Sequence, residues 1–146
     1  MAQELYHFIG GKRVKGTSGR FSDVYWPMTG EVAARCTLAS DAELKAAVEN
    51  AKAAQPAWAA TNPQRRARVL QKFIDLVARD NDKLALTLAR EHGKTIPDAK
   101  GDIQRGIEVI EVCLGAPQML KGEYTEGAGP GIDIYSMRQQ LGVVAG

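Results

Sequence analysis

Residues 140–146 at the end of the chain read QLGVVAG. A short apolar run of this kind, interrupted by glycine, is typical of a strand that is buried in a parallel sheet. Such a strand normally leads into a turn, a helix or a phosphate-binding loop, but here the sequence stops at Gly146. We therefore expect an α/β chain whose last strands have no complete sheet of their own to join.

Ahead of this run, the apolar residues follow a helical period. Ser40 and Glu43 form a capping box, which predicts a first helix that ends before Pro56. Asn62 followed by Pro63 is typical of a cap with proline at the first helical position, and it predicts the start of a second helix.

Two further helices follow from terminator and cap signals. The second helix is expected to break or bend at 80–81, and a third then runs to His92 with Gly93 as its terminator. A fourth begins near Thr95 and continues to about Gly115. The sequence therefore predicts four helices in succession.

Extended segments flank the helices on both sides. Gly10-Gly11 predicts a hairpin turn, and two further strand candidates lie at 21–26 and 31–37. After the helices, residues 121–131 are polar and rich in glycine, so we expect a loop there. Residues 132–140 are expected to form a strand.

Composition limits the function without identifying it. The chain has 146 residues, 45% of them hydrophobic, and a net charge of +2, which suits one ordinary domain and is too small to imply a nucleic-acid or membrane partner. The sequence shows no signal peptide and no apolar run that is long enough to span a membrane. Cys36 and Cys113 are far apart, so a reduced, cytoplasmic setting is expected.

The stretch GDIQRGIEVIEVCLGAP at 101–117 is the most informative part of the fourth helix. On a helical projection most of its apolar side chains share one broad arc, opposite Gln104 and Glu108. Arg105 lies within the apolar arc, and Gly106 beside it leaves room for a close neighbour. A guanidinium in such surroundings needs an anionic partner. The pattern leaves two interpretations open. In the structural one, Arg105 forms an ion pair within the protein, or its side chain reaches the edge of the arc. In the functional one, the guanidinium binds a ligand carboxylate through two N–H donors.

The other candidates favour structural interpretations. Cys113 and Cys36 have no base beside them in the pattern and are expected to pack in the core. His92 is expected to cap a helix end, His7 to lie on the surface, and the basic stretch at 65–72 to form a solvated helix face. The glycine-rich GAGPGI has the wrong spacing for a phosphate loop. From the residues alone we expect neither a complete catalytic site nor a metal site.

Six stretches of the sequence, taken in order, resemble a known protein family. Together they resemble the N-terminal part of aldehyde dehydrogenases and, through GDIQRG and YSMRQQLGVVAG, the branch formed by the methylmalonate-semialdehyde dehydrogenases. The stretches are FIGGKRV (8–14), PMTGEV (27–32), AWAATNPQRRARVL (57–70), EHGKT (91–95), GDIQRGIEVIE (101–111) and YSMRQQLGVVAG (135–146). Trp26 and Gln140 depart from the asparagine and proline that are common in the family at those positions.

The resemblance implies a division of the chain and a set of cofactors. It implies N-terminal strands and helices at 1–131, an oligomerisation-arm strand at 132–141, and the start of the first nucleotide-binding strand at 142–146. Enzymes of this branch oxidise a malonate-type semialdehyde with NAD and transfer the acyl group to coenzyme A. Their catalytic cysteine and glutamate would lie beyond Gly146, so we expect this chain alone to be inactive.

The resemblance assigns one functional residue and one type of partner. It implies that Arg105 binds the carboxylate of the semialdehyde substrate. It also implies that the strand region around 132–140 pairs with a neighbouring subunit in a homo-oligomer. An alternative role is that of an interaction module that pairs with a full-length dehydrogenase subunit. A third hypothesis, a basic helical module that binds nucleic acid, is disfavoured by the low net charge.

Overall fold

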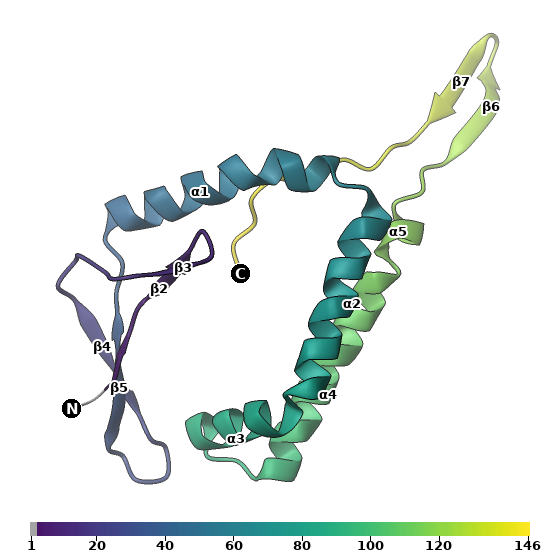
Figure 1. Ribbon diagram of the computed structural model, residues 1–146. Coiled ribbons are helices and arrows are strands. Elements are labelled where there is room, and N and C mark those ends of the chain that lie inside the picture. The colour runs from purple at the N-terminus through teal and green to yellow at the C-terminus, as the bar shows by residue number, and fades with distance from the viewer. Residues whose placement is uncertain (1–2) are drawn as a thin grey trace.

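The structure is a computed structural model that describes residues 3–146, and it combines small sheets with a block of helices (Figure 1). Near the N-terminus, β1 (Gln3–Leu5) runs parallel to β5 (Val32–Thr37), and β4 (Phe21–Tyr25) pairs antiparallel on the other side of β5. The predicted strands at 21–26 and 31–37 are thus confirmed.

The predicted turn at Gly10-Gly11 is also confirmed. It joins β2 (His7–Ile9) to β3 (Lys12–Val14) in an antiparallel hairpin. Gly10 and Gly11 have φ angles of 60° and 76°, which only glycine adopts without strain and which match the twist of a two-residue hairpin.

Helix α1 (Asp41–Ala60) begins at the predicted capping box but does not end where the sequence predicts. The Ser40 side chain accepts from the backbone N–H of Glu43, whose carboxylate accepts from the backbone of Ser40. The prediction of an end before Pro56 is wrong, because the helix continues through Pro56 to Ala60. Helix α1 has no buried residue, so water can solvate the carbonyl that the proline leaves without a donor.

The other predicted helices are confirmed within a residue or two. They are α2 (Pro63–Arg79), α3 (Asn81–His92) and α4 (Ile96–Leu114), followed by the short α5 (Ala116–Met119). Helices α2 and α4 lie side by side, and α3 packs across one end of α4 (Figure 1). Their contact surfaces contain the buried residues Ile74, Ala85, Ala99 and Ile107.

The C-terminal part of the chain differs from the prediction in three places. Residues 121–131 contain strand β6 (Tyr124–Gly129), which pairs antiparallel with β7 (Ile132–Tyr135), so the expected loop is wrong. The strand expected over 132–140 ends at Tyr135, and 140–146 form no strand. Hydrogen bonding between strands explains all three differences. Strands β6 and β7 supply each other with hydrogen-bond partners, whereas residues 140–146 have no neighbouring strand among the described residues.

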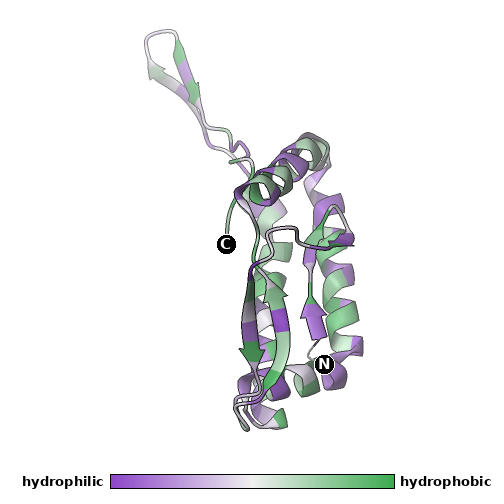
Figure 2. Cartoon of the chain, turned by 90° about the vertical axis from the view of Figure 1, so that its left-hand side faces the viewer, coloured by the Kyte–Doolittle hydropathy of each residue, from purple (hydrophilic) through white to green (hydrophobic). Residues whose placement is uncertain are grey.

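The fold class is confirmed as a mixed α/β arrangement, but little of its apolar surface is covered. The buried hydrophobic residues of the described range are Ala34, Ile74, Ala85, Ala99 and Ile107. Figure 2 shows apolar residues on the surfaces of both strands and helices, and the β6–β7 hairpin projects away from the rest of the chain. Among residues 3–146, every helix is too short or too polar to cross a bilayer.

Candidate functional site

Helix α4 carries Arg105, the one residue that the sequence singles out for ligand binding. The helix starts at Thr95, whose side chain accepts a hydrogen bond from the backbone N–H of Asp98, and it packs through Ala99 and Ile107. These contacts fix the rotation of α4, because buried residues eight positions apart lie on one face of a helix. Arg105 therefore lies to one side of the packed face.

Arg105 is exposed, and within residues 3–146 its guanidinium has neither a hydrogen bond nor an ion pair. It shares a helix face with Val109 and Val112, as the projection predicts, but these valines are 65% and 64% exposed. Of the interpretations that the pattern left open, the structural ion pair is absent from the described residues, whereas an exposed side chain at the edge of the packed face is compatible with both of the others. Arg105 is exposed because α2 and α3 cover only the Ala99–Ile107 side of α4.

Gly106 does not make the close contact that the sequence suggested. A Cβ atom added to Gly106 would have no heavy atom within 4 Å among the described residues. Gly106 instead lines a mostly apolar cavity of about 350 Å³ between α2, α3 and α4, together with Ile103 and Ile110. The helix position next to Arg105 therefore faces open space and not a packed neighbour.

A small cluster of charges surrounds the first turns of α4. The Lys94 ammonium donates a hydrogen bond to a carboxylate oxygen of Asp102, and only 15% of the Lys94 side chain is exposed. This hydrogen bond is the main reason that the pKa of Asp102 is lowered, and the positive charges of Lys94, His92 and Arg105 act in the same direction. Arg105 thus lies close to a carboxylate that is already engaged.

His92 stands in the last turn of α3, as predicted, but the cap of that helix is Gly93. Gly93 adopts a left-handed φ of 81°, and its N–H donates to the carbonyl of Ala89 at 2.8 Å. The side chain of His92 makes no hydrogen bond in the described part of the chain, so its contribution is the favourable placement of an imidazole at a helix C-terminus.

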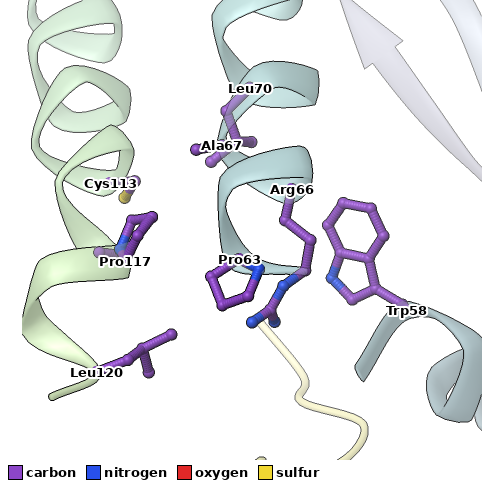
Figure 3. A pocket seen from close by; sticks show the side chains of 9 residues that line it. Trp58, Pro63, Arg66, Ala67, Leu70, Cys113, Pro117 and Leu120 are labelled. Atoms are coloured by element: carbon purple, nitrogen blue, oxygen red, sulfur yellow. The ribbon is translucent and has the colours of Figure 1, made fainter. Parts of the chain in front are cut away.

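The ends of α1, α2 and α4, together with α5, line a second cavity, of about 260 Å³, which sequence reasoning did not identify (Figure 3). Cys113 lines it and is exposed, so the expectation that this thiol packs in the core is wrong. The physical reason is that α2 and α5 border this cavity without closing over it, so the thiol stays open to solvent. Cys36, in β5, is half-buried, closer to the predicted packing role.

Arg66 is the exception within the basic stretch at 65–72. Arg65, Arg68 and Lys72 are exposed, as a solvated face requires, but Arg66 is half-buried. Figure 3 shows its side chain between Pro63 and Trp58, and its buried Nε has no hydrogen-bond partner in the part of the chain that the structure describes. The burial of Arg66 could have been predicted from its position three residues after Pro63, because this position lies on the side of α2 that faces the cavity.

The remaining candidates do not assemble into a site. His7 was expected on the surface, but it is half-buried beside Gly16, and among residues 3–146 its Nε2 has no hydrogen-bond partner. The GAGPGI stretch forms the end of β6 and the turn into β7, and no helix follows it. Within residues 3–146, no group of three or more His, Cys, Asp or Glu side chains could hold a metal ion.

Comparison with known proteins identifies the class to which this arrangement belongs. The profile of the aldehyde dehydrogenase family matches residues 14–146. The chain therefore belongs to the aldehyde dehydrogenase family, and the predicted resemblance is confirmed.

The relatives also confirm the branch. A malonate-semialdehyde dehydrogenase of Pseudomonas aeruginosa is 44% identical over 142 residues, which are 97% of this chain and 28% of that protein. The mitochondrial acylating methylmalonate-semialdehyde dehydrogenase of Arabidopsis thaliana is 42% identical over 146 residues, which are 100% of this chain and 24% of that protein.

Solved structures support the same conclusion for the fold. A crystal structure, in complex with NAD, of a Sinorhizobium meliloti protein assigned as a methylmalonate-semialdehyde dehydrogenase is 64% identical, with a TM-score of 0.93. The match covers 97% of this chain and 29% of that one. The methylmalonate-semialdehyde dehydrogenase of Oceanimonas doudoroffii is 40% identical, with a TM-score of 0.88, over 95% and 28% of the two chains. The chain thus spans less than a third of the length of the relatives that it matches.

Proposed function

We propose that this chain is the N-terminal part of an NAD-dependent, coenzyme A-acylating dehydrogenase of methylmalonate or malonate semialdehyde. Its products would be propionyl-CoA or acetyl-CoA, carbon dioxide and NADH. The names of the relatives support the substrate class, and the NAD complex of the Sinorhizobium meliloti protein supports the cofactor. The unpaired, exposed guanidinium of Arg105 is the observation within this chain that carries the proposal.

Arg105 is proposed to bind the substrate carboxylate. A guanidinium offers two parallel N–H donors, which match the two oxygens of a carboxylate. Holding the carboxylate end of a semialdehyde places its aldehyde end at a fixed distance from α4, which orients the aldehyde toward a nucleophile. The hydrogen bonds to a charged group would contribute about 1.5–3 kcal/mol to substrate binding.

The described residues provide no site that fits NAD or coenzyme A. The glycine-rich GAGPGI forms a hairpin turn, and the Ser40–Glu43 capping box already occupies the N-terminus of α1, which follows β5. We therefore assign both cofactors, together with the catalytic cysteine and glutamate, to polypeptide outside this chain. The division into 1–131, 132–141 and 142–146 is retained as part of this proposal.

The experiment that tests this function compares two classes of substrate in the full-length enzyme. Arg105→Leu should lower kcat/KM for malonate or methylmalonate semialdehyde by about 10- to 150-fold, the equivalent of about 1.5–3 kcal/mol. The same variant should change kcat/KM for propanal little, because propanal has no carboxylate. Equal losses on both substrates would mean that Arg105 is structural, and no loss on either would remove Arg105 from the site.

The isolated 146-residue chain provides a complementary test. It should produce no NADH from either semialdehyde, because the groups that form and break bonds are assigned elsewhere. NADH formation above the blank would show that this chain contains a catalytic site of its own.

A second role, assembly, is supported by the β6–β7 hairpin. The hairpin projects from the helices (Figure 1), and Ile132, Ile134 and Tyr135 are all more than half exposed. An exposed strand edge with apolar side chains is suited to pairing with another sheet. We propose that it pairs with a neighbouring subunit in a homo-oligomer, or that the chain alone pairs with a full-length subunit. Co-purification of the chain with a full-length relative would support the second form, and a chain that stays monomeric beside the relative would refute it.

The location of the enzyme is proposed to be the cytoplasm. Cys36 and Cys113 are both free in the structure, as expected in a reducing compartment. The Arabidopsis thaliana relative carries a mitochondrial name, so fractionation of the source cells is the direct test.

A further inference from the structure

The immediate neighbours of Arg105 raise the question of why its guanidinium stays unpaired. Two carboxylates lie within one helical turn, Asp102 three residues before Arg105 and Glu108 three residues after it. Side chains at this spacing on a helix meet, and an Asp–Arg or Glu–Arg pair there is normally favourable. In the described residues neither carboxylate forms an ion pair with Arg105.

Both carboxylates are engaged by other side chains. Lys94, which follows the end of α3, donates a hydrogen bond to Asp102. The side-chain amide of Gln104 donates to Glu108 at 3.3 Å. The Lys94 contact is the stronger of the two, because it joins opposite charges and only 15% of the Lys94 side chain is exposed.

We infer that Lys94 is a positioning residue that keeps Arg105 available for the substrate by neutralising and holding the carboxylate of Asp102. The inference rests on the proposed function of Arg105 and deepens it. Without Lys94, Asp102 would be free to turn toward Arg105 and to compete with the substrate carboxylate for the same N–H donors. Lys94 would thus act on substrate affinity through Asp102, without touching the substrate.

The test is steady-state kinetics on the full-length enzyme, made from its own coding sequence or by joining this chain to the remainder of the Sinorhizobium meliloti relative. Lys94→Met keeps the length of the side chain and removes its charge. It should raise KM for malonate semialdehyde about two- to fivefold, the effect of one exposed ion pair that competes with the substrate. The KM for propanal and kcat for both substrates should stay within about twofold, since the competition concerns only the carboxylate.

The double variant Lys94→Met with Asp102→Asn separates this role from a merely structural one. Removing the competitor should restore the wild-type KM for malonate semialdehyde, even though the Lys94–Asp102 contact is still missing. A structural role for the contact predicts that the double variant stays impaired. If Lys94→Met alone is poorly folded, the variant Lys94→Gln and the double variant answer the same question.

Two further variants exclude a general effect of charge. Lys100 lies on the same helix and pairs with Asp82 of α3 at 2.6 Å, so Lys100→Met makes the same charge change without freeing a carboxylate beside Arg105. Lys100→Met should leave KM for malonate semialdehyde unchanged, and so should Asp102→Asn. If the positive charges simply attracted the anionic substrate, Lys100→Met would raise KM and Asp102→Asn would lower it.

The possible failures are distinguishable. A normal KM in Lys94→Met, a double variant that stays impaired, or an equal effect of Lys100→Met would overturn the role of Lys94 while leaving Arg105 in place. Loss of the substrate-specific effect in Arg105→Leu would instead overturn the proposed function itself.

Discussion

The carboxylate of Glu43 accepts two hydrogen bonds from Thr17, from the backbone N–H at 2.7 Å and from the hydroxyl at 3.1 Å. The other oxygen of the same carboxylate accepts from the backbone and the hydroxyl of Ser40, both at 2.8 Å. One side chain in the first turn of α1 therefore caps its own helix and also fastens the segment that follows β3.

These hydrogen bonds predict a specific dependence of stability on pH. They lower the pKa of Glu43 from 4.5 to about 2, mainly through the backbone and side chain of Ser40 and the backbone of Thr17. Because the folded pKa lies below the unfolded one, the contribution of Glu43 is fully present above about pH 4.5 and is lost as the pH falls toward 2. Glu43→Gln should therefore lower Tm at pH 7, and the difference from wild type should shrink between pH 4.5 and 2.

Thermal unfolding followed by circular dichroism across this pH range measures the effect. Glu49→Gln is the matched control, since Glu49 lies on the same helix and, within residues 3–146, pairs only with Lys52, at 3.0 Å. An exposed pair of this kind contributes less than about 1 kcal/mol. A Glu43→Gln difference that stays constant from pH 7 to 2 would contradict the assignment.

The capping box shows which parts of the fold the sequence could predict. The cap signals predict the helix ends correctly, because caps are local interactions between residues a few positions apart. These signals are Ser40 with Glu43, Asn62 with Pro63, and Gly93. The failure at Pro56 has the opposite cause. A proline inside a helix leaves one carbonyl without a donor, and its ring crowds that carbonyl. An exposed helix can bend and let water solvate the carbonyl, and whether α1 would be exposed is not a local property.

The candidate site, too, could be predicted only in those features that depend on local sequence. The helical projection places Arg105 beside Val109 and Val112 correctly, since all three belong to one helix. It could not predict that this face is exposed, because burial depends on which other elements pack there. Likewise, the hydrogen bond from Lys94 to Asp102 joins a loop to a helix and has no signature in the sequence.

Gly93 supplies a second prediction, on the turn between α3 and α4. Its φ of 81° is unfavourable for any residue with a Cβ, and an added Cβ would lie 3.1 Å from Cγ of Pro27 and 3.3 Å from Sδ of Met28. Gly93→Ala should reduce the free energy of unfolding by about 1–2 kcal/mol, measured by urea denaturation. Gly93→Asn should cost less, because asparagine tolerates the left-handed region better. Equal costs would mean that the contact with Pro27, and not the backbone, limits this position.

The exposure of Cys113 supplies a third prediction, on thiol reactivity. Cys113 is exposed at the cavity of Figure 3, whereas Cys36 lies half-buried in the central strand of its sheet. A maleimide should label Cys113 at least about tenfold faster, since labelling of Cys36 requires a local opening that costs about 1.4 kcal/mol or more. Mass spectrometry of the labelled peptides measures both rates. In Cys113→Ser the fast phase should disappear, and labelling of both thiols at one rate would refute the prediction.

The base of the β6–β7 hairpin supplies the last prediction. Glu123 and Ser136 are joined there by two hydrogen bonds of 2.9 Å, one between their backbones and one from the N–H of Glu123 to the Ser136 hydroxyl. A Cβ added to Gly122 would lie 1.8 Å from the carbonyl oxygen of Ser136, which is backbone and cannot simply turn away. Gly122→Ala should therefore open the base of the hairpin at a cost of about 1–3 kcal/mol.

Amide hydrogen exchange at Ser136 measures this opening, which should speed exchange there about five- to 150-fold while exchange in α2 and α4 stays unchanged. Gly101→Ala is the matched control, because an added Cβ at Gly101 would meet no atom within 4 Å. Gly101 lies inside α4, so this substitution should stabilise the helix by about 0.5–1 kcal/mol and leave the hairpin unaffected. Unchanged exchange at Ser136 in Gly122→Ala would show that the two segments are not held together as the structure describes.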